Sequence, residues 1–215
     1  PLVLQPMFGN ADWTYEDFKP LWSATSNSFA IVVRKDDDRF PDFPALVKYM
    51  TENPGDLRYS PGVTDALPHM VAAKVMQTSD VVAQVVPYPE IDNAIKDLRG
   101  SVLDFMVINP GVYASNKNDV RVLAVLSELE GASDTYGGAP RVQDLGIELG
   151  MKGLAPMGWN WWLVRKETPD DVVARLQDAM GKALARDDVH QKLLDMGYVP
   201  LGYGPDQYEE IVAPV

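Results

Sequence analysis

The chain has 215 residues, of which 46% are hydrophobic and 23% are charged, and it carries a formal net charge of −12 without any cysteine. The acidic balance argues against nucleic acids and anionic membranes as partners, since both are bound through basic surfaces. The lack of thiols excludes disulfides, cysteine nucleophiles and Cys-based metal sites, and the longest apolar runs are far too short to span a bilayer.

The first half of the chain is predicted to alternate between strands and helices. A buried strand is expected at 29–33 and a helix at 43–50. A strand at 57–59 then runs into a Ser-Pro-Gly turn and a helix that starts near Thr64. Further along, the sequence predicts a buried strand at 81–86, a helix at 91–98, a strand at 103–108, one helical turn at 112–116 and a strand at 121–127.

The second half continues this order after a long polar loop and a short helix at 141–145. A Trp-rich strand is expected at 157–164. Thr168 with the following Pro and two acids forms a strong helix start, and that helix is expected to reach about residue 185. Two more helices are expected up to residue 196 and at 205–212. The alternation predicts an α/β protein with mainly parallel sheets.

Three stretches follow predicted strands and would lie at the ligand-binding edge of such a sheet: 60–65, 88–92 and 109–113. The turn after the strand at 57–59 is the leading candidate. Free backbone N–H groups at a helix N-terminus can receive an anion, because they lack partners and the helix dipole is positive there. A plain strand-to-helix connection is the alternative interpretation of this turn.

Signs of catalysis or of a cofactor are weak. His69 and His190 are far apart, and Asp65 alone, four residues before His69, is too little for a metal site. No nucleophile elbow, phosphate loop or dinucleotide fingerprint occurs. We therefore predict no catalytic residue, no metal and no cofactor.

The Trp-rich strand places Trp159 and Trp161 on one face and Trp162 on the other. Core or hinge packing is the favoured interpretation of this cluster, ahead of ligand stacking, because indoles bury a large apolar area.

Several segments in one order resemble the solute-binding receptors of tripartite tricarboxylate transporters, the Bug family. The matching pieces cover most of the chain from about Asp17 to Ile211. They are Asn53-Pro-Gly-Asp-Leu-Arg-Tyr-Ser60, the turn with His69, Val86-Pro-Tyr88, Ala94-Ile-x-Asp97-Leu-x-Gly100-x-x-x-Asp104, Asn109, Arg121-Val-Leu-Ala-Val125, Pro140-Arg-Val142, Trp159, Thr168-Pro-Asp-Asp-Val-Val-x-x-Leu176 and Ala185-x-Asp-Asp-Val-x-x-x-Leu-x-x-Met-Gly197.

The resemblance implies a periplasmic-binding-protein-like clamshell of two lobes, here 1–34 with 158–215 and 35–157. It implies a periplasmic receptor that does no chemistry, holds a small organic acid between its lobes and delivers it to the membrane components of a transporter. Backbone N–H groups and waters would bind the ligand carboxylate, so the net charge of −12 is no obstacle. Neither nucleic acid nor direct membrane insertion is implied.

Carried over by position, the resemblance implies a set of ligand-binding residues on the second lobe and on one connecting strand. The Tyr88 hydroxyl is either a ligand contact, which Tyr88→Phe would weaken, or serves packing only. The full set is Ser60, Pro61, Gly62, Val63, Thr64, Asp65, Ala66, Tyr88, Glu90, Asp92, Asn109 and Trp159.

The sequence departs from the family pattern in ways that affect the expected ligand. The strand and Gly-rich loop that open the first lobe in the family have no counterpart, so the first lobe is expected to be incomplete. Asp65 and Ala66 stand where the family has Gly followed by Ser or Thr, Pro89-Glu90 stand where it often has Lys-Gly, and Ile108 stands in place of an Asp. The acids at Asp65, Glu90 and Asp92 suggest a ligand with positive character, such as an amino acid.

Two other functions stay open at this point. The effector-sensing domain of a transcription regulator would use a similar clamshell, but neither a helix-turn-helix nor a basic face is visible. A two-lobe enzyme would need an acid–base pair or a nucleophile, and the sequence offers no convincing one.

Overall fold

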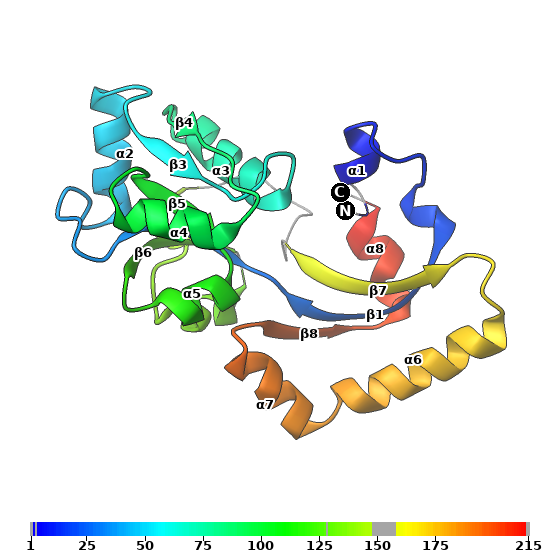
Figure 1. Ribbon diagram of the computed structural model, residues 1–215. Coiled ribbons are helices and arrows are strands. Elements are labelled where there is room, and N and C mark those ends of the chain that lie inside the picture. Colours follow the sequence, from blue (N-terminus) through cyan, green and yellow to red (C-terminus); the bar gives the residue numbers. More distant parts are fainter. Residues whose placement is uncertain (1, 3, 128, 148–157, 214–215) are drawn as a thin grey trace. The chain divides into compact units, whose positions relative to one another are not determined.

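The computed structural model describes residues 2, 4–127, 129–147 and 158–213, and these fold into two compact units (Figure 1). Unit 1 comprises Pro1–Asn27 and Lys152–Val215, and unit 2 comprises Ser28–Met151. Each unit combines a sheet with helices, as the α/β prediction requires. The lobe boundaries expected from the sequence differ from these units by a few residues and stay a prediction.

Unit 1 is built on an antiparallel sheet of β1 (Phe18–Ser26), β7 (Trp159–Arg165) and β8 (Val199–Tyr203), with β1 in the middle. Its helices are α1 (Leu4–Met7), α6 (Asp170–Leu184), α7 (Asp187–Asp195) and α8 (Tyr208–Val212). Single 3-10 turns cover Tyr15–Asp17 and Pro205–Gln207. Met157, the expected first residue of the Trp-rich strand, lies outside the described residues.

The two faces of this sheet carry different helices. The Trp22 indole N–H donates to the Gln177 carbonyl at 2.8 Å, so α6 covers the face of Trp22. On the other face, Trp161 lies opposite Ser23 in the register, and its ring meets Tyr208 of α8 edge-on at 5.0 Å. The helix α6 also comes so close to the sheet at Gly181 that a Cβ there would lie 2.8 Å from the Trp22 ring.

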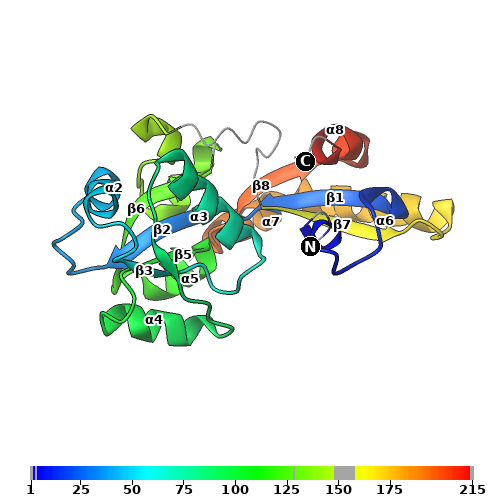
Figure 2. The ribbon, with the colours of Figure 1, turned by 90° about the horizontal axis from the view of Figure 1, so that it is seen from above.

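Unit 2 contains a five-stranded sheet in the order β4-β3-β5-β2-β6. The strands are β2 (Phe29–Arg34), β3 (Arg58–Ser60), β4 (Gln84–Val85), β5 (Phe105–Ile108) and β6 (Val120–Leu126). The helices are α2 (Phe43–Glu52), α3 (Leu67–Thr78), α4 (Ile91–Arg99) and α5 (Pro110–Asn116), and 3-10 turns cover Glu130–Ala132, Asp134–Tyr136 and Val142–Leu145. Viewed as in Figure 2, α3 and α4 lie on opposite sides of the sheet.

The core of unit 2 follows from its apolar runs. Every residue of β5 is buried, as is β2 up to Val33, and the Tyr59 and Phe105 rings stack at 4.9 Å between neighbouring strands. Helices contribute the apolar faces that their periodicity predicts, such as Ala94, Ile95 and Leu98 on α4. The helices therefore bury the central strands β2 and β5 from both sides.

The expectation of mainly parallel sheets is wrong for the described strands. Parallel pairing joins β3 to β4 and to β5, whereas β2 runs antiparallel to both β5 and β6, and the sheet of unit 1 is antiparallel. A fully apolar run shows that a strand is buried on both faces, but it does not fix the direction of its neighbours.

Two element boundaries also differ from the prediction. In place of the expected buried strand at 81–86 lies the short edge strand β4. Val85 in this strand and Val82 just before it are exposed. The helix expected from Thr64 begins at Leu67, because Asp65 takes φ +59° and Ala66 is extended.

Candidate functional site

The carboxyl ends of β3, β4 and β5 gather most of the predicted ligand residues at one end of the sheet in unit 2. The loop from Ser60 to Ala66 joins β3 to α3 there. Ser60 is fully buried, and its hydroxyl oxygen accepts a hydrogen bond from the Gly62 N–H at 3.1 Å. Gly62 has φ +85°, which glycine adopts without steric cost. The loop therefore turns sharply around the buried Ser60, with Pro61 also buried, and exposes Val63, Thr64 and Asp65.

The N-terminus of α3 offers free backbone donors. Its N-cap residue, Ala66, has no side chain that could accept from the first turn. Within the described residues no acceptor is recorded for the N–H groups of Val63, Thr64 or Ala66. These groups and the positive end of the helix dipole suit a carboxylate.

Asp65 does not cap its own helix. It occupies the left-handed region, which Asp tolerates better than most residues, and its N–H points to the His69 Nδ1 at 3.4 Å. None of the ion pairs between described residues involves this carboxylate. Asp65 thus presents an exposed negative charge next to the donors of α3.

The loop after β4 is tied to the loop after β3 through the backbone. The Tyr88 N–H donates to the Gly62 carbonyl at 2.8 Å, and the Val86 N–H donates to the Tyr59 carbonyl at 2.8 Å. The two loops therefore form one continuous edge.

The Tyr88 side chain, however, points along α4. Its hydroxyl donates to the Asp97 carboxylate, and this bond, more than burial, raises the pKa of the tyrosine. Since Asp97 lies well inside the helix that begins at Ile91, the hydroxyl is directed away from the helix start. Sequence reasoning missed Asp97 as the partner of Tyr88, although both belong to the matching segments of the family.

Glu90 and Asp92 flank the start of α4. Glu90 is the N-cap residue but its side chain accepts no hydrogen bond there, and Asp92 is in the first turn. Both carboxylates are exposed at the positive end of the helix dipole, which stabilises acidic side chains at this position. The dipole therefore explains why these acids occur here without a ligand cation.

Asn109 occupies the end of β5 and the N-cap of α5. Its Oδ1 accepts a hydrogen bond from the Val112 N–H at 2.9 Å, which leaves the Nδ2 amide as the part of the side chain that can donate to a ligand. The residue before it, Ile108, is bonded through its carbonyl to the buried Tyr136 hydroxyl at 3.0 Å. Tyr136 was not among the residues predicted from the sequence.

Trp159 belongs to unit 1, so the structure brings together only the predicted residues of unit 2. Trp159 is half-buried on the same face of β7 as Trp161. Both indole nitrogens are buried, and neither N–H has a hydrogen-bond partner within the described residues. The Ser23 hydroxyl is likewise buried without a partner there. A contribution of Trp159 to ligand binding stays a prediction.

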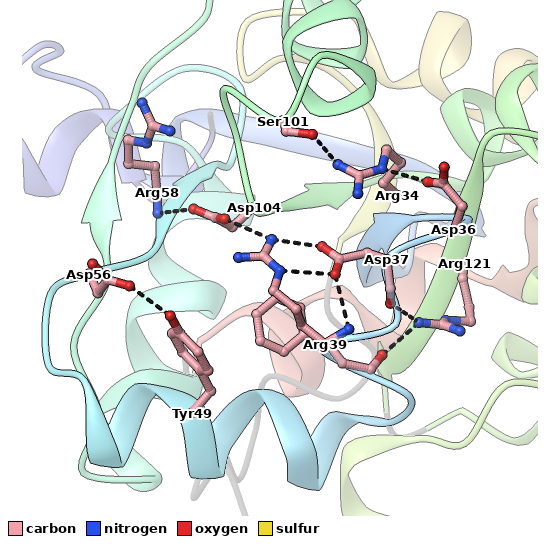
Figure 3. A network of polar contacts seen from close by, with 11 residues as sticks. Arg34, Asp36, Asp37, Arg39, Tyr49, Asp56, Arg58, Ser101, Asp104 and Arg121 are labelled. Carbon is pink, nitrogen blue, oxygen red and sulfur yellow. Dashed lines mark hydrogen bonds and ion pairs between the residues drawn. The ribbon is translucent and has the colours of Figure 1, made fainter.

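A separate polar cluster lies at the opposite end of the unit 2 sheet (Figure 3). Arg39 holds Asp37 with hydrogen bonds of 3.0 and 2.7 Å and reaches Asp104 at 3.0 Å, while Asp104 accepts from the Arg58 N–H at 2.8 Å. Arg121 donates to the Asp37 and Phe40 carbonyls at 2.6 and 2.8 Å. Arg39 and Arg121 thus hold both ends of this cluster, although the buried Nε of Arg121 has no partner among the described residues, and we interpret the cluster as a structural clamp that aligns the amino ends of β3 and β5.

The described residues contain no group of His, Asp and Glu side chains that could hold a metal ion. Among the helices that the structure describes, none combines the length and the apolar composition needed to cross a membrane. The chemistry available at the loop edge is therefore binding by backbone donors next to acidic side chains.

Comparisons with known proteins point to one receptor family. The family described as "Tripartite tricarboxylate transporter family receptor" matches residues 1–214. A protein of Pseudomonas sp. (strain P51), described as "UPF0065 protein in tcbD-tcbE intergenic region", is 29% identical over 88% of this chain.

Two solved structures share the fold. A TctC solute binding protein from Polaromonas superimposes with a TM-score of 0.75 at 23% identity, over 98% of this chain and 70% of that one. The R. palustris protein Rpa4515, solved with adipate, superimposes with a TM-score of 0.76 at 19% identity, over 92% of this chain and 64% of that one. These identities establish the fold alone, and they confirm the α/β, periplasmic-binding-protein-like class. The chain spans 55% of the length of the Pseudomonas relative.

Proposed function

The chain belongs to the tripartite tricarboxylate transporter receptor family, and on this premise we propose that it is an extracytoplasmic, periplasmic receptor for a small carboxylate. The family is one of receptors rather than of enzymes. Its natural partners would be the ligand and the membrane components of a tripartite transporter.

One observation carries the proposal for this chain. The loop from Ser60 to Ala66 presents backbone N–H groups without acceptors, in the described part of the chain, at the uncapped N-terminus of α3. Such donors bind a carboxylate without requiring a basic side chain, so they suit a chain with a net charge of −12. The adipate in the Rpa4515 structure shows that a protein of the same fold takes a dicarboxylate.

Within this proposal Ser60–Ala66, Asn109, Tyr88 and Trp159 have distinct roles, whereas Glu90 and Asp92 stabilise the start of α4. The Ser60–Ala66 backbone holds the carboxylate, and Asn109 offers its Nδ2 amide. Tyr88 contributes by holding its loop against Gly62 rather than through its hydroxyl. Trp159 would add the contribution of unit 1.

The exposed Asp65 favours an amino acid as a second ligand class. Its carboxylate has no cationic partner in the described residues and stands beside the proposed carboxylate donors. A ligand ammonium group would pair with it, whereas the second carboxylate of a diacid would have to point away from it.

A thermal-shift panel tests both parts of the proposal. Adipate, malate and succinate are compared with glutamate, alanine and an uncharged polyol on the unaltered chain and on Asp65→Asn. A carboxylate receptor is stabilised by at least one of the acids and not by the polyol. If an amino acid is the ligand, Asp65→Asn weakens its effect and spares the diacids. No stabilisation by any carboxylate at millimolar concentration would argue against the proposed function.

A further inference from the structure

We propose that Tyr136 is a positioning residue of the candidate site, whose buried hydroxyl fixes the end of β5 and with it Asn109. The inference rests on the proposed function in so far as Asn109 contacts the ligand. The positioning itself is a property of the ligand-free chain and can be tested without one.

The Tyr136 hydroxyl joins two strands at the point where they separate. It lies 3.0 Å from the Ser28 carbonyl, just before β2, and 3.0 Å from the Ile108 carbonyl, the last of β5. The register pairs Ala30 with Ile108, so continuing it would set Ser28 opposite Pro110. Proline has no N–H to donate, and the ladder cannot continue there.

The hydroxyl therefore offers its single proton to two acceptors, of which the Ser28 carbonyl has no N–H opposite it in the ladder. Ser28 is 1% exposed and Ile108 is 2% exposed, so neither carbonyl can turn to bulk water instead. A buried carbonyl without a donor costs free energy, which is why such groups are almost always paired. Burial also raises the pKa of Tyr136 well above its ordinary value, although its bond with Ser28 acts in the opposite direction. The hydroxyl therefore keeps its proton at neutral pH, where it can donate.

The aromatic ring extends this contact to α5. Tyr136 packs on Tyr113 with ring centroids 5.3 Å apart. Tyr113 is in α5, whose N-cap is Asn109. One side chain thus holds the strand before Asn109 by its oxygen and the helix after Asn109 by its ring.

This arrangement matters for binding because Asn109 is fixed from both sides. Its Oδ1 is committed to the Val112 N–H, which leaves the Nδ2 amide in one direction. A ligand contact of this kind depends on position, since hydrogen bonds weaken steeply outside their preferred distance and angle. Loosening the end of β5 would move this donor while leaving the loop at Ser60–Ala66 in place.

The test compares Tyr136→Phe with Tyr49→Phe. Tyr49→Phe also removes one hydroxyl hydrogen bond, which Tyr49 donates to the Asp56 carboxylate at 2.8 Å. This bond lies at the amino end of the sheet, away from Asn109. Two-dimensional 15N spectra of the ligand-free chain are expected to show the largest changes in Tyr136→Phe at the Asn109 side-chain amide and the Gly111 and Val112 amides. Tyr49→Phe is expected to leave these signals unchanged. Calorimetry with adipate is expected to give a three- to tenfold higher Kd for Tyr136→Phe only.

The outcomes separate the two proposals. Unchanged signals at Asn109, Gly111 and Val112 in Tyr136→Phe would overturn the positioning role, whether or not a ligand binds. If the signals move but adipate binds as before, the role in ligand binding is overturned. If the unaltered chain binds no carboxylate, the proposed function fails while the spectra still test the positioning.

The unaltered chain provides a second test should Tyr136→Phe not fold. A slowly exchanging Tyr136 hydroxyl proton, with a nuclear Overhauser contact to the Asn109 amide, is the expected result and supports the positioning role. A hydroxyl proton that exchanges rapidly with solvent and shows no such contact would overturn it.

Discussion

Tyr88 shows that a residue on a ligand loop can contribute through its backbone while its side chain serves the fold. Its N–H binds the Gly62 carbonyl, and its hydroxyl binds Asp97 far along α4. A hydroxyl has one proton to donate, and here it goes to a carboxylate inside the protein. From sequence alone, ligand contact and packing were both open for this hydroxyl, and its bond to Asp97 favours packing.

We expect Tyr88→Phe to leave the ligand Kd within about twofold and to lower the free energy of unfolding by about 0.5–1.5 kcal/mol, the usual net value of one hydrogen bond. Calorimetric titration and urea unfolding measure the two quantities. A tenfold loss of affinity with unchanged stability would show that the hydroxyl turns to the ligand after all.

Asp37 is the residue on which the polar clamp depends. Its side chain is 3% exposed and is held by Arg39. Burial alone would raise the pKa of this carboxyl, but the hydrogen bonds from Arg39 outweigh burial and place the pKa below its ordinary value. A carboxyl with a lower pKa in the folded state adds stability above its unfolded pKa and loses it as pH falls through the folded value.

Asp37→Asn is therefore expected to lower the free energy of unfolding by about 1–3 kcal/mol at pH 7, as for a lost hydrogen bond to a charged group. The difference from the unaltered chain should shrink below about pH 3.9, the ordinary pKa of Asp. Asp36→Asn is the control, because Asp36 forms an exposed pair with Arg34 that contributes at most about 1 kcal/mol. Urea unfolding at a series of pH values checks this, and a difference that does not depend on pH would contradict it.

At the scale of elements, helices with strong local signals were predicted correctly, whereas the pairing of the strands was not. The helices α2 and α4 lie close to where capping and periodicity predict them. The direction of β2 and the pairing of β8 depend on contacts between distant segments, which a local pattern does not contain. The start of α3 was missed because Asp65 adopts the left-handed region, and a sequence pattern rarely reveals where a non-glycine residue does so.

Gly158 is the element-scale feature that we expect to tolerate substitution least. Its φ is +75°, and a Cβ there would lie 2.2 Å from the Asn27 carbonyl oxygen, while its own carbonyl accepts the Asn27 N–H at 2.8 Å. This close approach joins β7 to the end of β1. A larger residue must break the contact.

Gly158→Ala should lower the free energy of unfolding by about 2–4 kcal/mol, which combines backbone strain with the clash. Gly202→Ala is the matched control, since Gly202 has φ +64° and open space around its Cβ position. We expect about 1–2 kcal/mol for that strain alone. Equal losses in urea unfolding would show that the contact with Asn27 adds nothing.

At the scale of the whole molecule, the sequence supported the fold class and the family. The family resemblance depended on segments such as the turn at Ser60 and the start of α6, which keep their order along the chain. It could not show that Tyr88 and Asp97 pair or that Tyr136 reaches Ile108, because these contacts depend on three-dimensional packing. The proposed ligand site could not be confirmed from sequence either, since its proposed donors are backbone groups that every residue except proline carries.

The central claim is that the free backbone N–H groups of Val63, Thr64 and Ala66 bind a carboxylate. Titration of the 15N-labelled chain with the acid that stabilises it most tests this directly. We predict saturable shifts that are largest at the amides of Val63, Thr64 and Ala66, with smaller shifts at Asn109. Saturable shifts confined to other parts of the chain, or none at millimolar ligand, would contradict the claim.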